Sequence, residues 1–296
     1  MNRGEINTSL AGLVRERRPI IHCITNYVTA GDVANIILAC GGSPIMADCP
    51  EEVSDITAMA NCLLLNMGTP KEATRAAMEK AGREANRLNR PVIFDPVGIG
   101  ASPYRTETAL SLLKEVKPTV IRGNASELGV LLRELTGKNL EGEKGAASSS
   151  RGVDASFSDE IREETLESLT EVTRDLSAAT EAVIVMTGAI DIVSAGKETR
   201  LIRNGCPQMS HITGSGCMLD GIIASYAAAV VLSPSQHNVL GAAALATAAS
   251  GLCGERAAKR AEKLQGGTGS FRCCFFDEVS LLDESTLKGG INIEVF

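Results

Sequence analysis

Short apolar runs recur along the chain and leave room between them for segments of helical length. Within each run the apolar residues are largely consecutive rather than alternating with polar ones. This indicates strands that are buried on both faces, as in a parallel sheet covered by helices. The runs occupy residues 19–25, 43–46, 62–67, 91–97, 118–121 and 182–187.

The segments between these runs show helical periodicity. The first has apolar residues at positions 30, 33, 34, 37 and 38 and stops at Gly41-Gly42. Thr29, with Asp32 three residues on, predicts a capped start for this helix. Further helices are expected at residues 70–88, 103–116, 126–135, 158–179, 217–231 and 236–260, and a β-hairpin at residues 190–194 and 199–203.

The alternation of strands and helices defines the expected architecture. Strand–helix–strand units with right-handed crossovers give an α/β fold, with a central, mostly parallel sheet and helices on both faces. At 296 residues, the chain is expected to form a single domain over residues 1–296. Residues 137–152 are rich in Gly and Ser and carry too little apolar surface for a core, so they predict a flexible surface loop.

Composition narrows the classes of partner. The net charge is −7 and the basic residues form no run that resembles a basic arm, so nucleic acid is not an expected partner. Aromatic residues make up 3% of the chain and Trp is absent, which favours a small substrate held by shape and polar contacts. There is no C-x-x-C pair among the cysteines and no stretch of eighteen apolar residues. We therefore expect a cytoplasmic protein without a disulfide framework or membrane association.

A glycine-rich turn stands directly before a long Ala-rich helix. It comprises Thr213, Gly214, Ser215, Gly216 and Cys217. Glycines let the backbone approach a ligand closely, and a helix N-terminus offers unpaired N–H groups and the positive end of the helix dipole. The turn is therefore a candidate phosphate site, although taken alone such a turn is more often an ordinary helix start.

Two carboxylates follow predicted strands. Asp95 ends one apolar run, and Glu127 follows another in an N-x-x-E spacing. At the carboxyl ends of parallel strands, where α/β folds bind ligands, two such groups can hold a hydrated Mg²⁺ ion. Taken alone, Asp95 would cap the turn before Pro96, and Glu127 would be a solvated residue in the first turn of a helix. Arg122 follows the run at 118–121 and is suited either to ATP phosphates or to a surface salt bridge.

Taken together, the motifs resemble those of the hydroxyethylthiazole kinases. The turn at 213–217 is similar to their T-G-x-G-C signature. That signature corresponds to the G-A-G-D anion-hole motif of the wider ribokinase-like superfamily, with Cys217 where most members carry an Asp base. The other matching segments are NYVT (26–29), DVAN (32–35), PIM (44–46), LNMGT (65–69), DPVGIGA (95–101), IRGNASE (121–127), RGVD (151–154) and MTG (186–188). The resemblance covers about residues 20–254 and departs at 137–150, which is longer and richer in Ser than the family pattern.

This resemblance implies a fold, a reaction and a site. The fold would be ribokinase-like. The reaction would be the ATP- and Mg²⁺-dependent phosphorylation of the hydroxyl of 5-(2-hydroxyethyl)-4-methylthiazole in thiamine salvage, carried out by a homotrimer with active sites between subunits. The implied residues are Asp95 and Glu127 for the metal, Arg122, Thr187, Gly214, Ser215 and Gly216 for ATP and its phosphates, Asn26, Met46 and Gly214 for the substrate, and Cys217 for catalysis.

In this role Cys217 would be a weak general base. A free thiol has a pKa of about 8.5 and is only a few per cent thiolate at neutral pH, although a helix N-terminus is expected to lower that pKa. Because phosphoryl transfer depends mainly on positioning and charge neutralisation, we expect a slow but competent enzyme.

Three alternatives stay open at this point. The first is an ATP-dependent dehydratase of hydrated nicotinamide nucleotides, and the second is a pyrimidine or pyridoxal kinase; both would be expected to carry Asp in place of Cys217. The third is a non-catalytic nucleotide sensor, which would be expected to have lost the metal carboxylates or the glycine turn.

Overall fold

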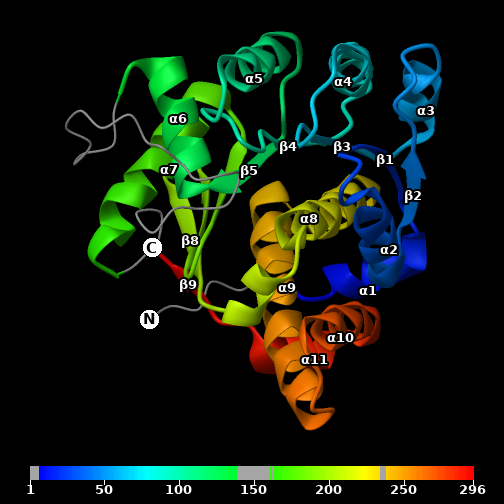
Figure 1. Ribbon diagram of the computed structural model, residues 1–296, viewed down its shortest axis with the longest axis vertical. Coiled ribbons are helices and arrows are strands. Elements are labelled where there is room, and N and C mark those ends of the chain that lie inside the picture. Colours follow the sequence, from blue (N-terminus) through cyan, green and yellow to red (C-terminus); the bar gives the residue numbers. More distant parts are fainter. Residues whose placement is uncertain (1–6, 139–160, 162, 234–237) are drawn as a thin grey trace.

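A nine-stranded sheet runs through the molecule (Figure 1). The computed structural model describes residues 7–138, 161, 163–233 and 238–296. The strand order is β2-β1-β3-β4-β5-β6-β7-β8-β9; neighbouring strands from β2 to β6 are parallel, and those from β6 to β9 are antiparallel. The strands are β1 (Ile20–Ile24), β2 (Ser43–Met46), β3 (Cys62–Asn66), β4 (Val92–Asp95), β5 (Val120–Asn124), β6 (Val183–Thr187), β7 (Asp191–Ala195), β8 (Glu198–Ile202) and β9 (Ile293–Val295).

Helices cover both faces of this sheet (Figure 1). One face carries α1 (Leu10–Arg17), α2 (Ala30–Cys40), α8 (Ser215–Leu232), α9 (Val239–Lys263), α10 (Thr268–Leu281) and α11 (Glu284–Gly290). The other carries α3 (Val53–Met59), α4 (Glu72–Arg87), α5 (Pro103–Glu115), α6 (Ala125–Thr136) and α7 (Leu166–Thr180). The expected α/β architecture with helices on both faces is therefore confirmed.

Each parallel strand contributes to two cores, because consecutive residues of a strand point to opposite faces. In β3, Cys62 and Leu64 join the core beneath α2, α8 and α9, whereas Leu63 and Leu65 join the core beneath α4 to α7. All four side chains are fully buried. A strand in this position has no polar face, which explains the unbroken apolar runs in the sequence. All six predicted strands and the β7–β8 hairpin are confirmed.

Two of the shifts in predicted boundaries concern β5 and α7. β5 continues to Asn124, because its residues go on pairing with β6, and Arg122 therefore lies within the strand rather than after it. The helix predicted from residue 158 is described only from Leu166, after a 3-10 turn at Glu163–Thr165. Residues 139–160 lie outside the described part of the chain, and with them most of the expected loop at 137–152.

The start of α2 differs from its prediction. The helix ends at Gly41 as expected, but Thr29 makes no side-chain cap. The backbone N–H of Thr29 instead donates to Asn26 Oδ1 at 3.1 Å. The carboxylate of Asp32 is drawn away from the helix start by an ion pair with Arg272 of α10. A tertiary contact therefore replaces the predicted capping box.

Helix α8 lies at the centre of one face, against α1, α2, α9 and strands β1, β3 and β4. Among the described residues it is the helix that is long and apolar enough to cross a membrane, and 78% of it is buried inside the protein. An apolar surface all round is typical of such a central core helix. Its charged residue, Asp220, is fully buried. The N-terminus of α8 lies where the parallel strands end, and this places the functional site.

Candidate active site

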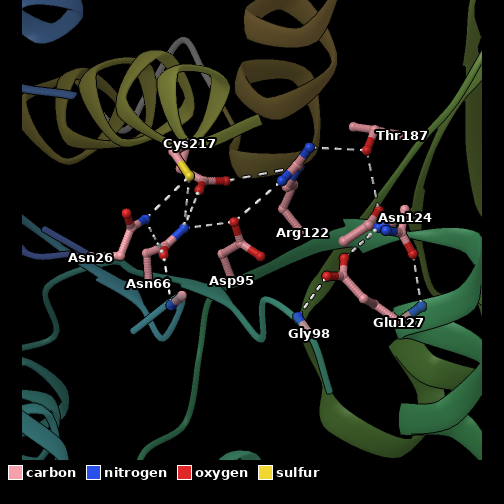
Figure 2. A network of polar contacts seen from close by, with 12 residues as sticks. Asn26, Asn66, Asp95, Gly98, Arg122, Asn124, Glu127, Thr187 and Cys217 are labelled. Carbon is pink, nitrogen blue, oxygen red and sulfur yellow. Dashed lines mark hydrogen bonds and ion pairs between the residues drawn. The ribbon is translucent and has the colours of Figure 1, made fainter. Parts of the chain in front are cut away.

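Polar side chains gather where the parallel strands end (Figure 2). Strands that run in one direction bring their carboxyl ends to the same edge of the sheet. Asn26 follows β1, while Asn66, Asp95 and Thr187 are the last residues of β3, β4 and β6. The first turn of α8 brings Cys217 to this edge, where both Asn side chains contact its sulfur.

Asn66 is the centre of the network. Its Nδ2 lies 2.8 Å from Asp95 Oδ2, 3.2 Å from Asp220 Oδ2 and 3.4 Å from Cys217 Sγ. The two hydrogens of one amide are therefore shared among three acceptors. Its Oδ1 accepts from Asn26 Nδ2 at 2.9 Å. Asn66 thus sets the relative positions of two carboxylates and a thiol.

Arg122 reaches into the same network from the middle of β5. Its two terminal nitrogens donate to Asp95 Oδ2 at 3.2 Å and to Thr187 Oγ1 at 3.1 Å. Its Nε lies 4.0 Å from Asp220 Oδ1. The guanidinium is almost buried and both aspartates are fully buried, so solvent screens these charges little. Arg122 therefore belongs to the buried cluster and forms no surface salt bridge.

The carboxylates of this cluster all have raised pKa values. Burial raises the pKa of Asp95, and the charge of Asp220 raises it further, while Arg122 opposes both. Burial raises the pKa of Asp220, against the effect of Arg122. Burial and then the charge of Asp95 raise the pKa of Glu127 to about 7, although two backbone amides oppose this. Arg122 therefore balances only part of the negative charge.

Glu127 is held in the first turn of α6 by a capping box. Asn124 Oδ1 accepts from the Glu127 backbone N–H at 2.8 Å, and Glu127 Oε2 accepts from the Asn124 N–H at 3.0 Å. Glu127 Oε1 accepts from the Gly98 N–H at 2.8 Å (Figure 2). The position agrees with a first-turn helix residue, but the side chain is only 7% exposed and is not solvated.

The glycine turn allows a close approach at the start of α8. Gly214 has a φ of +79°, and a Cβ there would collide with the side chain of Thr29. A Cβ on Gly216 would collide with the guanidinium of Arg122. Because α8 starts at Ser215, two residues before its predicted start, Ser215 and Gly216 supply N-terminal backbone amides. These amides and a guanidinium side by side suit a phosphate group.

The prediction of a lowered pKa for Cys217 is wrong. Burial raises the pKa of this thiol to about 11, and the charges of Asp95 and Asp220 contribute, against weaker opposite effects of Thr29 and Arg122. The helix N-terminus does not offset two nearby carboxylates and the loss of water. Cys217 is therefore a thiol at neutral pH.

One predicted residue lies outside the network, and two members of the network were not predicted. Met46 is the last residue of the edge strand β2 and is 41% exposed. Asn66 and Asp220 are these two members: Asn66 stands in the matching segment at 65–69 but was given no role, and Asp220 was not singled out. A signal for Asp220 exists, since it is the charged residue of an otherwise uncharged helix and its i+3 spacing from Cys217 puts both on one helix face.

The oxygen atoms of the cluster suit a hard divalent cation. Oδ1 of Asp95 and Oδ1 of Asp220 are buried without a hydrogen-bond partner in the described structure. Buried polar atoms are rarely left in this state unless a ligand or ion completes them. Carboxylate oxygens are the ligands that Mg²⁺ prefers. The predicted metal ligand Asp95 therefore has an oxygen available for a cation.

Fold and site together define the class of protein. A parallel sheet whose carboxyl edge carries an arginine, buried carboxylates and a glycine turn at a helix start is arranged for phosphoryl transfer. A ribokinase-like superfamily protein from Enterococcus faecalis V583 has the same fold, with a TM-score of 0.54 at 12% identity over 94% of this chain and 91% of that chain. The chain therefore has a ribokinase-like fold, and its site is arranged for phosphoryl transfer.

Closer comparison shows that the chain belongs to the hydroxyethylthiazole kinase family. The model of that family matches residues 12–285. A hydroxyethylthiazole kinase of Clostridium acetobutylicum is 46% identical over 283 residues, which cover 96% of this chain and 97% of the relative. The structure of a hydroxyethylthiazole kinase protein from Pyrococcus horikoshii OT3 matches with a TM-score of 0.82 at 28% identity, over 98% of each chain. The resemblance drawn from the motifs is confirmed.

Proposed function

We propose that this protein transfers the γ-phosphoryl group of ATP to the hydroxyl of 5-(2-hydroxyethyl)-4-methylthiazole, in thiamine salvage. The acceptor follows from membership of the hydroxyethylthiazole kinase family. The observation that carries the proposal is the start of α8, where the amides of the glycine turn lie against the guanidinium of Arg122 and Cys217 points into the same polar network.

Arg122, Thr187 and the glycine turn would bind the ATP phosphates. The contacts of Arg122 with Asp95 and Thr187 fix its planar head before a nucleotide arrives, so little reorganisation is needed on binding. The amides of Ser215 and Gly216 stand at helix positions that have no partner within the helix. These fixed donors would stabilise the negative charge of the group being transferred.

Asp95 and Glu127 would hold Mg²⁺. When bound, the ion neutralises phosphate charge and helps to orient the phosphates. Asp95 offers a buried oxygen without a partner, which supports a direct contact. Both oxygens of Glu127 already accept backbone hydrogen bonds, which supports a contact through water.

Cys217, Asn26 and Gly214 would hold the alcohol. Because burial keeps the pKa of Cys217 near 11, the thiol would act by its position far more than as a base. The side-chain amides of Asn26 and Asn66 both contact its sulfur at 3.4 Å and so fix that position. The catalytic effect would come mainly from alignment and from stabilisation of the phosphate.

The active unit would be a cytoplasmic homotrimer of single-domain subunits, with sites between subunits. Tyr27 and Val28 follow directly after Asn26, and their side chains are 71% and 58% exposed. Met46 is exposed on the neighbouring edge strand β2. Large apolar side chains exposed this close to the polar network suit coverage by another subunit. Once a neighbouring subunit completes the site, Met46 would contact the substrate.

The test is ADP release by the purified protein with ATP and Mg²⁺. The acceptors are 5-(2-hydroxyethyl)-4-methylthiazole, hydroxymethylpyrimidine, pyridoxal and ribose, with a control that lacks acceptor. The variant Arg122→Ala checks that the observed turnover belongs to this site, and Arg200→Ala, which removes an arginine of β8 from outside the cluster, is its matched control.

Turnover confined to the thiazole alcohol and abolished by EDTA and by Arg122→Ala would support the proposal. Turnover with another acceptor alone would keep the chemistry and reject the thiazole substrate. ATP binding without turnover on any acceptor would reject the kinase assignment in favour of a dehydratase or a sensor.

A further inference from the structure

We propose that Asp220 is, with Asp95, a direct ligand of the divalent cation at this site. The proposal rests on the proposed kinase function, because it takes the metal from that function. It concerns a residue outside the motifs that mark the family. Asp220 lies one turn after Cys217 on α8, with no exposed surface.

The apolar surroundings of Asp220 make it unfavourable to leave a carboxylate oxygen without a partner, as Oδ1 of Asp220 is. α8 is otherwise uncharged and is buried among apolar side chains. A charge in such a place is strongly unfavourable unless it is paired or bound to a metal. Arg122 gives only partial compensation, since its Nε lies 4.0 Å from Asp220 Oδ1, which is too far for a hydrogen bond. A core helix would carry a small apolar residue more easily at this position.

The hydrogen bonds of the three carboxylates differ, and they show which two have an oxygen available to bind the cation. Both oxygens of Glu127 accept backbone N–H groups. In Asp95 and Asp220, by contrast, Asn66 donates to each Oδ2 and leaves each Oδ1 without a hydrogen-bond partner. The oxygens that remain for a cation therefore belong to the two aspartates.

Charge and distance agree with this choice. Asp95, Asp220 and Glu127 with Arg122 leave two negative charges when all are ionised, and a divalent cation neutralises them. One ligand atom each of Asp95, Asp220 and Cys217 lies within 4.8 Å of the others. With metal–oxygen distances of about 2.1 Å, two oxygens on one Mg²⁺ ion are separated by up to roughly 4.2 Å, so the two carboxylates would need at most a small approach to share the ion. The sulfur of Cys217 is a poor ligand for this hard ion, so the aspartates would bind it.

The experiment measures metal binding directly. Mn²⁺ replaces Mg²⁺, and free Mn²⁺ is counted by electron paramagnetic resonance, with and without the β,γ-methylene analogue of ATP. Asp220→Asn is compared with Glu278→Gln, which neutralises a buried carboxylate paired with Arg256 and Arg260 outside the site. We expect Asp220→Asn to weaken Mn²⁺ binding by about tenfold or more, the scale of a damaged metal site, and Glu278→Gln to leave it unchanged.

Several results would overturn the proposal. Mn²⁺ affinity of Asp220→Asn within twofold of the wild type would do so. So would a loss of nucleotide affinity with unchanged Mn²⁺ affinity, because Asp220 would then serve only to hold Arg122. Absence of Mn²⁺ binding to the wild type, even with the nucleotide analogue, would also reject it.

A second measurement does not depend on a folded variant. Wild-type crystals with Mn²⁺ and the nucleotide analogue should show an anomalous peak within about 2.5 Å of an Asp220 oxygen. A peak at Asp95 and Glu127 alone would reject the role of Asp220. Wild-type turnover with the thiazole alcohol is measured separately, so that a wrong substrate with a correct metal site, and the reverse, give different results.

Discussion

Cys217 shows how neighbouring residues decide the chemistry of a side chain. The thiol stands at a helix N-terminus, which by itself favours thiolate. Burial and the two adjacent aspartates reverse this and raise its pKa to about 11. A group with its pKa this far above 7 is almost entirely a thiol at neutral pH. A thiol that is so seldom ionised contributes little as a general base. Cys217 would therefore act by positioning the substrate.

We therefore expect Cys217→Ala to keep measurable turnover. The variant would lose the contact of Cys217 with the alcohol but keep the groups that donate hydrogen bonds to the phosphate. We expect kcat to fall by no more than about tenfold, which is less than the roughly 10²–10⁴-fold typical of losing a general base. Steady-state kinetics of ADP release measure this, with Cys273→Ala as the control because Cys273 is exposed on α10. Complete loss of turnover with alcohol binding intact would contradict the expectation.

Glu127 makes the stability of the metal-free protein depend on pH. Its pKa is about 7 in the folded protein against an ordinary value of 4.5, so folding favours the protonated form. The resulting stability is complete below about pH 4.5 and is lost as the pH rises through 7, at a cost on the order of 3 kcal/mol. Urea unfolding should show lower stability at pH 8 than at pH 5.5.

Glu127→Gln separates this effect from other titrating groups. The variant loses one of the two backbone hydrogen bonds that Glu127 accepts, because an amide nitrogen cannot accept, but it no longer titrates. The difference in unfolding free energy between pH 5.5 and pH 8 should therefore shrink. An undiminished difference would show that other groups cause the pH dependence.

Among the elements, the start of α8 combines a helix terminus with a tertiary contact. Gly216 stands where the guanidinium of Arg122 leaves no room for a Cβ. Alanine is the better helix former by about 0.5–1 kcal/mol. Glycine at position 216 therefore allows the guanidinium of Arg122 to lie close to α8, and it does not stabilise the helix.

Gly216→Ala should consequently damage ATP binding more than folding. The methyl group would push the guanidinium away from Asp95 and Thr187, and we expect the KM for ATP to rise about tenfold while the unfolding free energy changes by less than about 1 kcal/mol. Gly12→Ala is the matched control, because Gly12 lies in α1 with open space around its Cβ position. Equal effects of both variants on KM would refute this account of Gly216.

The elements also show what the sequence could predict. Strands buried on both faces give apolar runs, so the sheet and its crossovers were predictable from the pattern alone. The short β9 has three residues and forms only by pairing with β8, so no local pattern marks it. The cap of α2 was mispredicted because Asp32 pairs with an arginine 240 residues away.

Part of the candidate site was predictable because its polar residues stand out from the apolar runs. Asp95, Arg122, Glu127 and the glycine turn stand at strand and helix ends, where polar residues are easily seen. Asp220 is hidden inside an apolar run that predicts core. Whether the pKa of Cys217 is raised or lowered depends on which strand ends surround the thiol, and only the folded sheet supplies this information.

For the whole molecule, the exposed apolar side chains beside the site predict an assembly. We expect light scattering to give a mass of about 93 kDa, three times the 31.0 kDa of one chain. Met46→Glu places a charge on the exposed edge strand and should yield smaller species with lower activity, since the site would lose its covering subunit. Leu264→Glu, 64% exposed at the end of α9, is the control. A monomeric wild type with full activity would disprove the shared site.

The polar network also fixes when the protein becomes able to bind its ligands. The contact of Asn26 with Cys217 joins residues 191 positions apart, and that of Asn66 with Asp220 joins residues 154 apart. At about 5–20 residues per second, the ribosome adds Cys217 on the order of ten to forty seconds after Asn26. Closing such long loops slows folding. Nucleotide and metal therefore cannot guide the early steps of folding, and can only stabilise a sheet that has already formed.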